Sequence, residues 1–303
     1  MSFSVTILGS SSALPTSKRY LTAHLVNHDE RFFLIDCGEG TQLQLRRFKQ
    51  KTARINHIFI SHLHGDHVYG LFGLISSFSM LGRKNVLNIY AHPKLEYILN
   101  DHFRYFDTDL QFPIKFHSIG SKKTQTLYED NKLEIIAFPL KHRIPCTGFI
   151  FREKQRLLNI KRDKIEFYNI GIREIINIKN GSDYVTEEGK LIPNEELTSL
   201  PKASKSYVYI TDTKPVDSAI PFLLNADLLY HEATFLESDT KLAKITYHST
   251  AAQAAKFAEA SKVKKLVLGH FSARYKHESK FLEEAKPIFL NTILAEDGMK
   301  IEV

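Results

Sequence analysis

The sequence predicts an α/β fold in which two β-rich halves face each other with helices on the outside, an αββα sandwich. Short β-like runs alternate with helix-like segments through the first 152 residues, and the alternation resumes after residue 205. The chain has 303 residues, of which 43% are hydrophobic. This is enough apolar material for one large buried core or two modest ones.

The individual elements are predicted from their hydrophobic period, because short apolar runs favour strands and apolar residues at helical spacing favour helices. In the first half, the expected strands are residues 5–8, 32–35, 57–60, 87–90, 133–138 and 149–152, and the expected helices are residues 41–48 and 93–102. In the second half, the expected strands are residues 207–210, 228–231 and 265–268, and the expected helices are residues 250–260 and 278–289.

Residues 154–205 break this rhythm, because they are polar and are punctuated by glycine, proline and Asn-Gly turn signals. Residues 151–179 contain eight Lys or Arg against four Asp or Glu. We interpret residues 154–205 as a basic arm inserted into a single domain that spans residues 1–303. Composition alone favours a solvated excursion over a binding element.

Charge and cysteine content limit the possible binding partners of the protein and the compartment in which it works. The formal net charge of +7 is compatible with RNA binding and equally with mere solubility. Two cysteines, Cys37 and Cys146, are too few for a disulfide framework. Residues 1–8 read as a strand and not as a signal peptide, and the apolar residues 68–81 are too short to span a bilayer. We therefore expect a cytoplasmic protein without a membrane segment.

One short segment carries three histidines and an aspartate within six positions: His62, His64, Asp66 and His67. It follows the β-like residues 57–60, where a tight turn would bring the four side chains together. Imidazole and carboxylate are ligands that Zn²⁺ prefers, and the arrangement predicts two ions that share a site and acidify a bridging water. The alternative is a histidine-rich surface turn without a metal.

Three more candidate ligands, His142, Asp212 and His270, each follow a predicted strand. Together with the first cluster they make seven ligands, which is enough for two ions. We expect one ion on His62, His64 and His142, the other on Asp66, His67 and His270, and Asp212 between them. Two Zn²⁺ per chain are expected, with Mn²⁺ as the alternative.

The His62-x-His64-x-Asp66-His67 pattern resembles the signature of the metallo-β-lactamase superfamily. Four further segments resemble those of one of its families, ribonuclease Z: residues 34–42 (Leu-Ile-Asp-Cys-Gly-Glu-Gly-Thr-Gln), residues 231–235 (His-Glu-Ala-Thr-Phe), residues 247–250 (Tyr-His-Ser-Thr) and residues 270–275 (His-Phe-Ser-Ala-Arg-Tyr). The resemblance implies a metallo-β-lactamase-like αββα sandwich and a homodimeric endoribonuclease. It also implies that the substrate is precursor tRNA, whose 3′ trailer is removed to leave a 3′ hydroxyl.

Cleavage of this kind must protonate the departing ribose oxygen, and an imidazole supported by a carboxylate can do so. His248 and Glu232 are the candidates for that pair, and Asp66 is the candidate for steering the attacking water. The alternatives are an ordinary helix-start residue for His248 and a buried, orienting carboxylate for Glu232.

Two segments are candidates for substrate binding. Residues 13–20 resemble the family's Pro-Thr-x-x-Arg-Asn loop, in which Lys18 or Arg19 would hold a phosphate, although Tyr20 stands in place of Asn. The alternative is an exposed basic turn. The inserted arm corresponds to the part of the family that grips the tRNA elbow, although residues 169–172 here lack the usual Gly-Pro pair.

Two rival functions stay open at this point. The first is another hydrolase of the same fold that acts on a small ester, thioester or phosphodiester, and the basic arm and the Glu232/His248 pair argue against it. The second is an RNA-binding protein that has lost catalysis, and the complete ligand set argues against that one.

Overall fold

The computed structural model describes residues 2–120 and 122–303. These residues form two compact units. The main unit comprises the residues up to Glu129, Glu134–Phe151 and Lys205–Val303, and the small unit comprises Asp130–Leu133 and Arg152–Ser204. The expected insertion, residues 154–205, overlaps the small unit except at Lys205, which belongs to the main unit.

The main unit contains two seven-stranded sheets among the described residues. The first sheet has the strand order β18-β1-β2-β3-β4-β5-β6. Its strands are β18 (Lys300–Glu302), β1 (Phe3–Gly9), β2 (Ala23–His28), β3 (Arg31–Ile35), β4 (Ile55–Phe59), β5 (Leu87–Ala91) and β6 (Ile114–Ser118). Neighbouring strands from β3 to β6 are parallel, whereas β18, β1, β2 and β3 pair in antiparallel fashion.

The second sheet has the strand order β17-β16-β15-β14-β9-β8-β7. Its strands are β17 (Thr292–Leu294), β16 (Leu266–Gly269), β15 (Leu228–Glu232), β14 (Ser206–Ile210), β9 (Cys146–Glu153), β8 (Leu133–Leu140) and β7 (Gln125–Glu129). The four strands β14 to β17 are parallel to their neighbours. Their carboxyl ends therefore meet at one edge of the sheet, where Asp212 and His270, two of the candidate metal ligands, follow β14 and β16.

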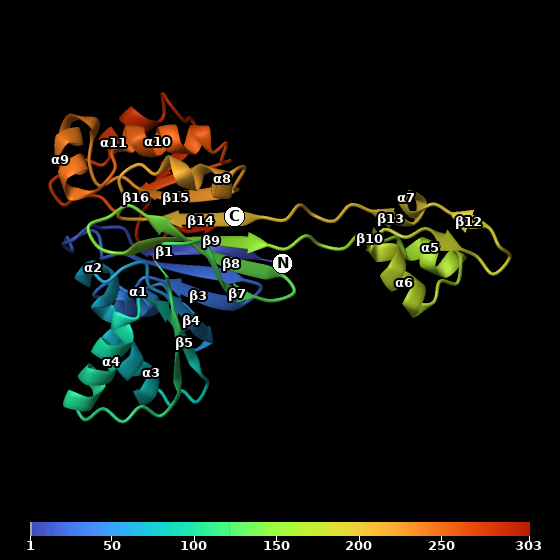
Figure 1. Cartoon of the computed structure of the whole chain (residues 1–303), viewed down its shortest axis with the longest axis horizontal. Coiled ribbons are helices and arrows are strands. Elements are labelled where there is room, and N and C mark those ends of the chain that lie inside the picture. Colours follow the sequence, from blue (N-terminus) through green and yellow to red (C-terminus); the bar gives the residue numbers. More distant parts are fainter. Residues whose placement is uncertain (1, 121) are drawn as a thin grey trace. The chain divides into compact units, whose positions relative to one another are not determined.

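Helices cover the outer faces of the two sheets (Figure 1). The helices along the first sheet are α1 (Thr41–Arg47), η1 (Thr52–Arg54), α2 (Gly65–Val68), α3 (Gly70–Met80) and α4 (Lys94–Tyr105). The helices along the second sheet are η2 (Asp217–Ala219), α8 (Ile220–Leu223), η3 (Glu237–Asp239), α9 (Thr240–Thr246), α10 (Ala251–Ala260) and α11 (Ser279–Ala285). The predicted αββα layering is confirmed.

The two faces of each strand serve two different cores, because successive side chains point to opposite sides of a sheet. On β3, Leu34 belongs to an aliphatic cluster that includes Leu71 and Leu74 of α3. Phe33, the residue before Leu34 on β3, lies between the sheets. Its ring contacts that of Phe151 of β9, with the ring centroids 5.9 Å apart. A core of aromatic rings therefore fills the space between the sheets.

Most predicted elements lie within two residues of the observed ones, but α11 is shorter than expected. It ends at Ala285, whereas the pattern predicted helix to residue 289. Pro287 explains the difference, because proline disfavours helix at the preceding residue and cannot donate a backbone hydrogen bond. In the main unit, strands β2, β6, β7, β17 and β18 and helices α2, α3, α8 and α9 were not predicted. Among the described residues, no helix is long and apolar enough to cross a membrane.

The small unit has its own hydrophobic core and is therefore more than a solvated loop. Two short ladders, β10 (Asn159–Ile160) with β13 (Thr198–Ser199) and β11 (Tyr184–Val185) with β12 (Leu191–Ile192), accompany α5 (Arg162–Phe167), α6 (Ile172–Lys179) and α7 (Asn194–Leu197). The buried core residues are Ile170, Ile178, Tyr184, Ile192 and Leu197. Their burial gives the segment a defined structure.

Candidate metal centre

The loop after β4 supplies the first four candidate ligands. His62 and His64 lie in the loop itself, and Asp66 and His67 lie in the first turn of α2, which begins at Gly65. Gly65 leaves room for a ring that packs against it, because a Cβ there would lie 2.2 Å from Cε2 of Tyr69. The short helix turns His67 into the protein, where the residue is completely buried.

The other three candidates come from the second sheet, as the sequence predicted. His142 follows β8, Asp212 follows β14 and His270 follows β16. Asp212 and His270 have φ of 42° and 58°, in the left-handed region that residues with a Cβ rarely adopt. Such strain is characteristic of functional sites, because the surrounding structure must hold it in place.

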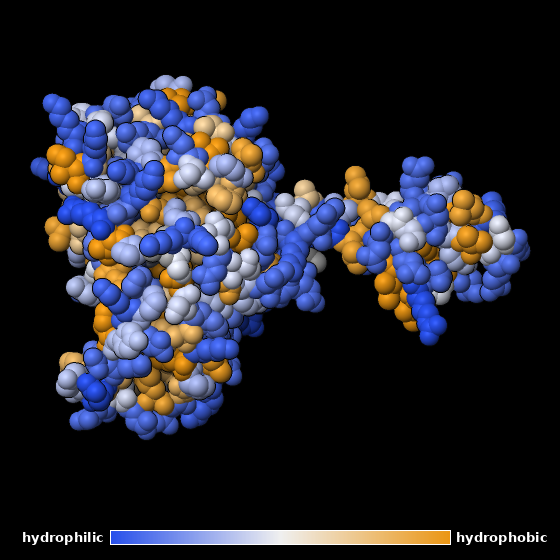
Figure 2. All heavy atoms as spheres, viewed as in Figure 1, coloured by the Kyte–Doolittle hydropathy of each residue, from blue (hydrophilic) through white to orange (hydrophobic). Residues whose placement is uncertain are grey.

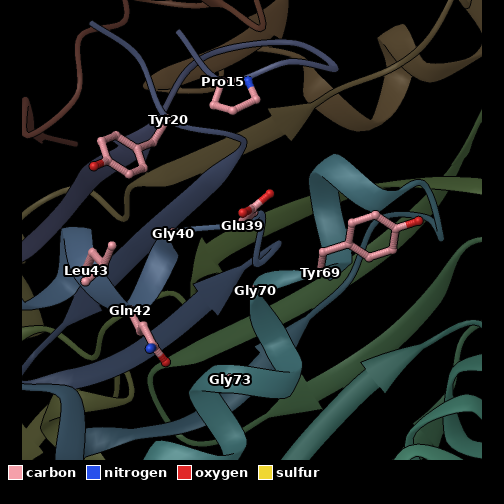
Figure 3. Close-up of a pocket in the computed structure, with 9 residues that line it drawn as sticks. All are labelled: Pro15, Tyr20, Glu39, Gly40, Gln42, Leu43, Tyr69, Gly70 and Gly73. Atoms are coloured by element: carbon pink, nitrogen blue, oxygen red, sulfur yellow. The ribbon is translucent and has the colours of Figure 1, made fainter. Parts of the chain in front are cut away.

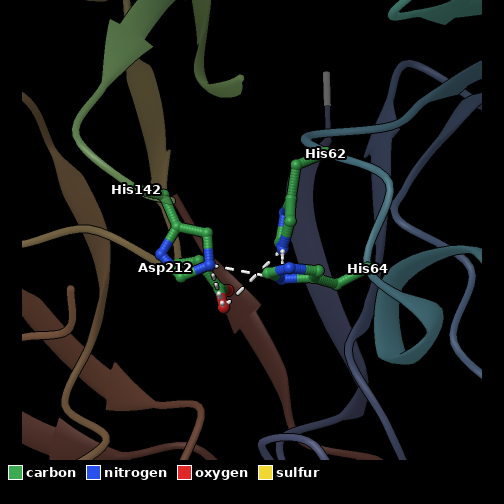
Figure 4. Close-up of side chains that lie close together, drawn as sticks. All are labelled: His62, His64, His142 and Asp212. Atoms are coloured by element: carbon green, nitrogen blue, oxygen red, sulfur yellow. Dashed lines mark hydrogen bonds and ion pairs between the residues drawn. The ribbon is translucent and has the colours of Figure 1, made fainter. Parts of the chain in front are cut away.

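Asp212 lies between two groups of imidazole nitrogens and presents one carboxylate oxygen to each. Its Oδ1 lies 3.7 Å from Nε2 of His62 and 3.9 Å from Nε2 of His142. Figure 4 shows these side chains and His64 pointing toward one another. Nδ1 of His64 lies 3.0 Å from Nε2 of His62 and 3.2 Å from Nε2 of His142.

The second group consists of Asp66, His67 and His270, and it lies on the other carboxylate oxygen of Asp212. Oδ2 of Asp212 lies 3.1 Å from Nε2 of His67 and 3.2 Å from Nε2 of His270. Oδ2 of Asp66 lies 3.4 Å and 3.5 Å from the same two nitrogens. All seven predicted ligands are therefore brought together, in the two groups that were predicted.

The donor atoms of this site fit two divalent ions. The Nε2 atoms of His67 and His270 are buried and make no hydrogen bond with any described residue. Ligands about 2.0–2.1 Å from a tetrahedral zinc lie roughly 3.3 Å from one another, close to the spacings found in both groups. Buried polar atoms without partners are costly, and a bound cation would satisfy them.

Electrostatics favour the protonation states that metal binding needs in the first group. Burial lowers the pKa of His62 well below its usual value, and burial also lowers the pKa of His64 and of His142. These imidazoles are therefore neutral at pH 7. In the second group, burial raises the pKa of Asp66, but His67 and His270 together outweigh burial and hold this pKa far below its usual value. Neutral imidazoles and ionised carboxylates are the forms that bind metals.

Asp36 binds Nδ1 of His67, the ring nitrogen that does not face the other candidate ligands. Its carboxylate accepts hydrogen bonds from Nδ1 of His67 (2.8 Å), the backbone nitrogen and hydroxyl of Ser61 (2.7 and 2.8 Å) and the hydroxyl of Tyr209 (2.7 Å). These contacts fix the orientation of the His67 ring, so that its Nε2 points into the site. Asp36 also has a positive φ, 55°.

Glu232 orients the ring of His248 in the way that Asp36 orients the ring of His67. Its Oε1 accepts a 2.9 Å hydrogen bond from Nδ1 of His248 and two more from the backbone nitrogens of Thr213 and Ser249. The ring of His248 stacks on that of His270, with the centroids 5.6 Å apart, so it lies at the edge of the metal centre. Burial lowers the pKa of His248, but the Glu232 carboxylate outweighs burial and raises this pKa to about 9.

Thr234 joins this pair to the metal ligands. Its hydroxyl donates to Oε2 of Glu232 at 2.8 Å and accepts from Nδ1 of His270 at 3.0 Å. The same glutamate therefore orients both His248 and, through Thr234, the ligand His270.

The two basic residues of the β1–β2 loop that were predicted to bind phosphate, Lys18 and Arg19, lie in different environments. Lys18 is exposed, whereas the side chain of Arg19 is only 12% exposed. Arg19 pairs with Glu278 at 3.0 Å and donates to the Ser10 hydroxyl and the Ala295 carbonyl. Two nitrogens of its guanidinium, Nε and Nη1, are thus engaged by internal partners.

Comparison with known proteins identifies the family. The chain is 48% identical to "Ribonuclease Z" of Phocaeicola vulgatus over 301 residues, which cover 99% of this chain and 97% of that protein. It is also 48% identical to "Ribonuclease Z" of Bacteroides fragilis, with 99% of each chain covered. The chain belongs to the ribonuclease Z family. This confirms the assignment made from the sequence motifs.

Solved structures agree with membership of the ribonuclease Z family. The short form of human tRNase Z is 28% identical to this chain, with a TM-score of 0.72 and 98% of each chain covered. A metallo-β-lactamase fold protein of Bacillus subtilis, 19% identical with a TM-score of 0.71 over all of both chains, shares the fold. A family model described as "Anti-Pycsar protein Apyc1" matches residues 3–158. As a member of the ribonuclease Z family, the chain is a metal-dependent endoribonuclease with the metallo-β-lactamase fold.

Sequence reasoning missed the residues that support the ligands of this ribonuclease Z family member. Asp36 and Thr234 lie in segments that carried the family resemblance, but neither was given a role, and Ser61 and Tyr209 were given none either. One signal was present for Asp36, because a carboxylate directly after a fully apolar strand rarely lies inside a protein without a partner. Nothing in the sequence indicated that Tyr209 would reach it.

Proposed function

We propose that this chain cuts precursor tRNA after the discriminator nucleotide, removes the 3′ trailer and leaves a 3′ hydroxyl on the tRNA. The observation that carries the proposal is the position of Asp212 between two groups of ligand nitrogens, in a chain 48% identical to ribonuclease Z relatives over nearly its full length. Sites that hold two divalent ions are typical of enzymes that hydrolyse phosphodiesters, and Asp212 would contribute one oxygen to each ligand group.

Each ligand group would hold one divalent ion, with zinc as the expected ion and manganese as the alternative. The imidazole-rich first group suits zinc, and the second group adds the Asp66 carboxylate. When bound, the ions supply Lewis acidity for phosphodiester hydrolysis by water at neutral pH. The remaining parts of the reaction fall to side chains of this chain.

Three side chains would handle water and protons. The Asp66 carboxylate orients the attacking water by accepting a hydrogen bond from it. His248 donates a proton to the departing 3′ oxygen from Nε2, because its Nδ1 is occupied by Glu232. Glu232 keeps the imidazole in that orientation and stabilises its charged form.

The β1–β2 loop contributes to substrate binding through two residues with different parts. Lys18, which is exposed, contacts a substrate phosphate. Arg19 acts on the substrate only through the loop that it anchors to Glu278.

The small unit serves as the substrate-binding arm. Residues 152–179 of the small unit contain eight Lys or Arg, of which Arg162 and Arg173 are exposed on α5 and α6. Figure 2 shows hydrophobic side chains gathered over α6 as well, where Ile172 and Ile176 are exposed. Phosphate contacts of the basic side chains would give affinity for tRNA without reading its sequence.

The chain acts as a homodimer in the cytoplasm. Met80 and Leu81, at the end of α3, are each 80% exposed, and exposed apolar residues of this size favour contact with another chain. Cys37 and Cys146 are both free and buried, which suits a reducing compartment. A sedimentation measurement of the chain and of a Met80→Lys, Leu81→Glu variant tests the dimer: we expect the variant to be monomeric.

The function is tested by incubating the purified protein with a precursor tRNA that carries a 3′ trailer and mapping the cut. We expect one metal-dependent cut after the discriminator nucleotide and two ions per chain by metal analysis. An Asp212→Ala variant, which lacks the bridge, should bind less metal and should not cut. Reconstitution of metal-free protein with Zn²⁺ or Mn²⁺ compares the two ions directly.

Bis(p-nitrophenyl) phosphate and a small ester serve as competing substrates in the same assay. Activity on these compounds without any cut in precursor tRNA would contradict the proposal and favour a small-molecule hydrolase. Binding of tRNA without metal or cleavage would also contradict it.

A further inference from the structure

We propose that a cavity beside the metal centre binds one unpaired nucleobase of the RNA, from a nucleotide next to the cleaved phosphate. Tyr20 and Tyr69 would hold that base by stacking. This inference rests on the RNA-cleaving function proposed above, and it adds the side chains that position the substrate.

The cavity has a volume of about 370 Å³ and is lined mainly by aromatic, apolar and glycine residues. The β1–β2 loop contributes Pro15 and Tyr20, the start of α1 contributes Gln42 and Leu43, and the start of α3 contributes Gly70 and Gly73. Glu39, Gly40 and Tyr69 complete the lining. Figure 3 shows Tyr20 and Tyr69 on opposite sides of Glu39, with Gly40 on the side of Tyr20.

Contacts with Asp66 place this cavity next to the metal centre. Oδ2 of Asp66, a candidate ligand atom, accepts a 2.9 Å hydrogen bond from the backbone nitrogen of Ala13, two residues before Pro15. The backbone oxygen of Asp66 packs against Gly38, where a Cβ would lie 2.5 Å from it. Tyr69 follows Asp66 by three residues, on the same short helical segment. A nucleotide in the cavity would therefore be close to the phosphate that is cut.

Both tyrosine rings are held in place by a glycine. A Cβ at Gly40 would lie 2.5 Å from Cδ1 of Tyr20, so the ring of Tyr20 packs directly on the backbone there. The ring of Tyr69 packs in the same way on Gly65. The backbone of Tyr20 is also fixed, because its nitrogen donates a 2.6 Å hydrogen bond to Asp297. Rings that are already fixed lose little freedom when a ligand stacks on them.

The chemistry of this lining suits a nucleobase. Tyr69 is 66% exposed, although a ring of this size would normally gain from being covered. Stacking on aromatic rings tolerates all four bases, because each base has a π-face. The Glu39 carboxylate at the rim is exposed and accepts hydrogen bonds, as the amino and imino groups of a base edge require.

The experiment combines ring removal with base removal on the metal-loaded protein. The variants are Tyr20→Leu and Tyr69→Leu, which keep apolar bulk but lose the ring, and Tyr20→Phe and Tyr69→Phe, which keep the ring. Tyr97→Leu is the matched control, because Tyr97 is 70% exposed on α4 and outside the cavity lining. The substrates are a precursor tRNA and two versions of it, one abasic at the discriminator nucleotide and one abasic at the first trailer nucleotide. The readout is kcat/KM, with metal content measured for each protein.

We expect each leucine variant to lower kcat/KM on the intact precursor by about 5- to 150-fold, the range for loss of one stacked base. On one of the two abasic precursors the wild-type protein should lose as much, and the leucine variants should lose little more. The abasic precursor that gives this result identifies the bound nucleotide. The phenylalanine variants should retain the difference between intact and abasic precursors, and Tyr97→Leu should behave as the wild type does.

Two results would overturn the inference. In the first, the leucine variants cut the intact precursor as well as the wild type does. In the second, they lose the same factor on all three precursors, which would mean that the rings act independently of any base, for instance at a contact with a second protein chain. If the wild-type protein cuts no precursor at all, the proposed function itself fails, and this result differs from both of the others.

Discussion

The hydroxyl of Tyr209, on β14 of the second sheet, donates a 2.7 Å hydrogen bond to the carboxylate of Asp36, which follows β3 of the first sheet. Asp36 also holds Nδ1 of the candidate ligand His67. One buried hydrogen bond thus connects the two halves of the sandwich to the geometry of the metal centre.

We expect Tyr209→Phe to weaken metal binding by about 10-fold, the lower end of the range for partners of metal ligands, because three other donors stay on Asp36. Competition with a chromophoric chelator measures the affinity. Tyr207→Phe is the matched control: its hydroxyl lies on the same strand, is equally buried and bonds to His24 at 2.8 Å. Equal metal affinities for the two variants would contradict the part that we give to Tyr209.

His248→Ala should lower kcat for precursor cleavage by about 10²- to 10⁴-fold, because the departing ribose oxygen would lose its proton donor. We expect the variant to keep two ions per chain. Single-turnover kinetics and metal analysis check both points. His248 also lies within reach of Asp212 and His270, so the loss of an ion from the variant would assign it as a ligand instead.

Lys18 and Arg19 are neighbours in sequence, yet we expect their removal to affect different properties, RNA binding and stability respectively. Arg19→Ala should lower the free energy of unfolding by about 1–3 kcal/mol, because hydrogen bonds to a partly buried charge are lost and Glu278 is left without its partner. Lys18→Ala should leave stability unchanged and weaken RNA binding. Urea denaturation and a binding titration of both variants separate the two roles. Normal stability in Arg19→Ala would argue against an anchoring role.

The small unit should determine how strongly precursor binding depends on salt. We expect replacement of Arg162, Lys164 and Arg173 by alanine to weaken binding and to reduce the slope of log K against log salt by about 0.7–0.9 for each phosphate that the variant no longer neutralises. Cleavage of a small phosphodiester should be unchanged. Binding is measured by titration between low and moderate salt.

A control with the same loss of charge is available on the main unit, where Lys94, Arg104 and Lys115 are exposed on α4 and β6. If their replacement reduced the slope as much as the changes in the small unit, the effect would come from net charge and not from binding of the RNA by the arm.

His57, which stacks on Tyr90, should make the protein less stable in mild acid. Burial lowers the pKa of His57 from 6.5 to about 4. The unfolded chain takes up this proton as the pH falls below 6.5, whereas the folded chain does not, so stability is lost between pH 6.5 and 4 and no further below that range. The loss is at most about 3 kcal/mol for this shift. In His57→Gln, unfolding free energies at about pH 8 and about pH 4.5 should differ by less than in the wild type, because the contribution of His57 is gone. A difference should remain, because His24 and the other buried histidines titrate in both proteins.

The sequence by itself determined the features that depend on local order. The strand-then-turn position of His62, His64, Asp66 and His67 predicted a metal site, because four ligands within six positions converge whatever surrounds them. Hydrophobic period predicted nine of the fourteen strands in the two large sheets and several helices, and strand ends predicted His142, Asp212 and His270 as candidate ligands. The edge strands β6, β7 and β17 escaped, because short and half-exposed strands have weak alternation.

Only the tertiary structure decided how these parts are held. Arg19 meets Glu278 across 259 positions and Tyr209 meets Asp36 across 173, and no local pattern encodes such distant pairs. The hydrophobic core of the small unit was also hidden, because its few apolar residues are scattered among charged ones. A carboxylate between two sets of imidazoles exists only after both sheets have folded against each other. For this reason the sequence predicted the candidate ligands, whereas the fold decided their geometry, protonation and support.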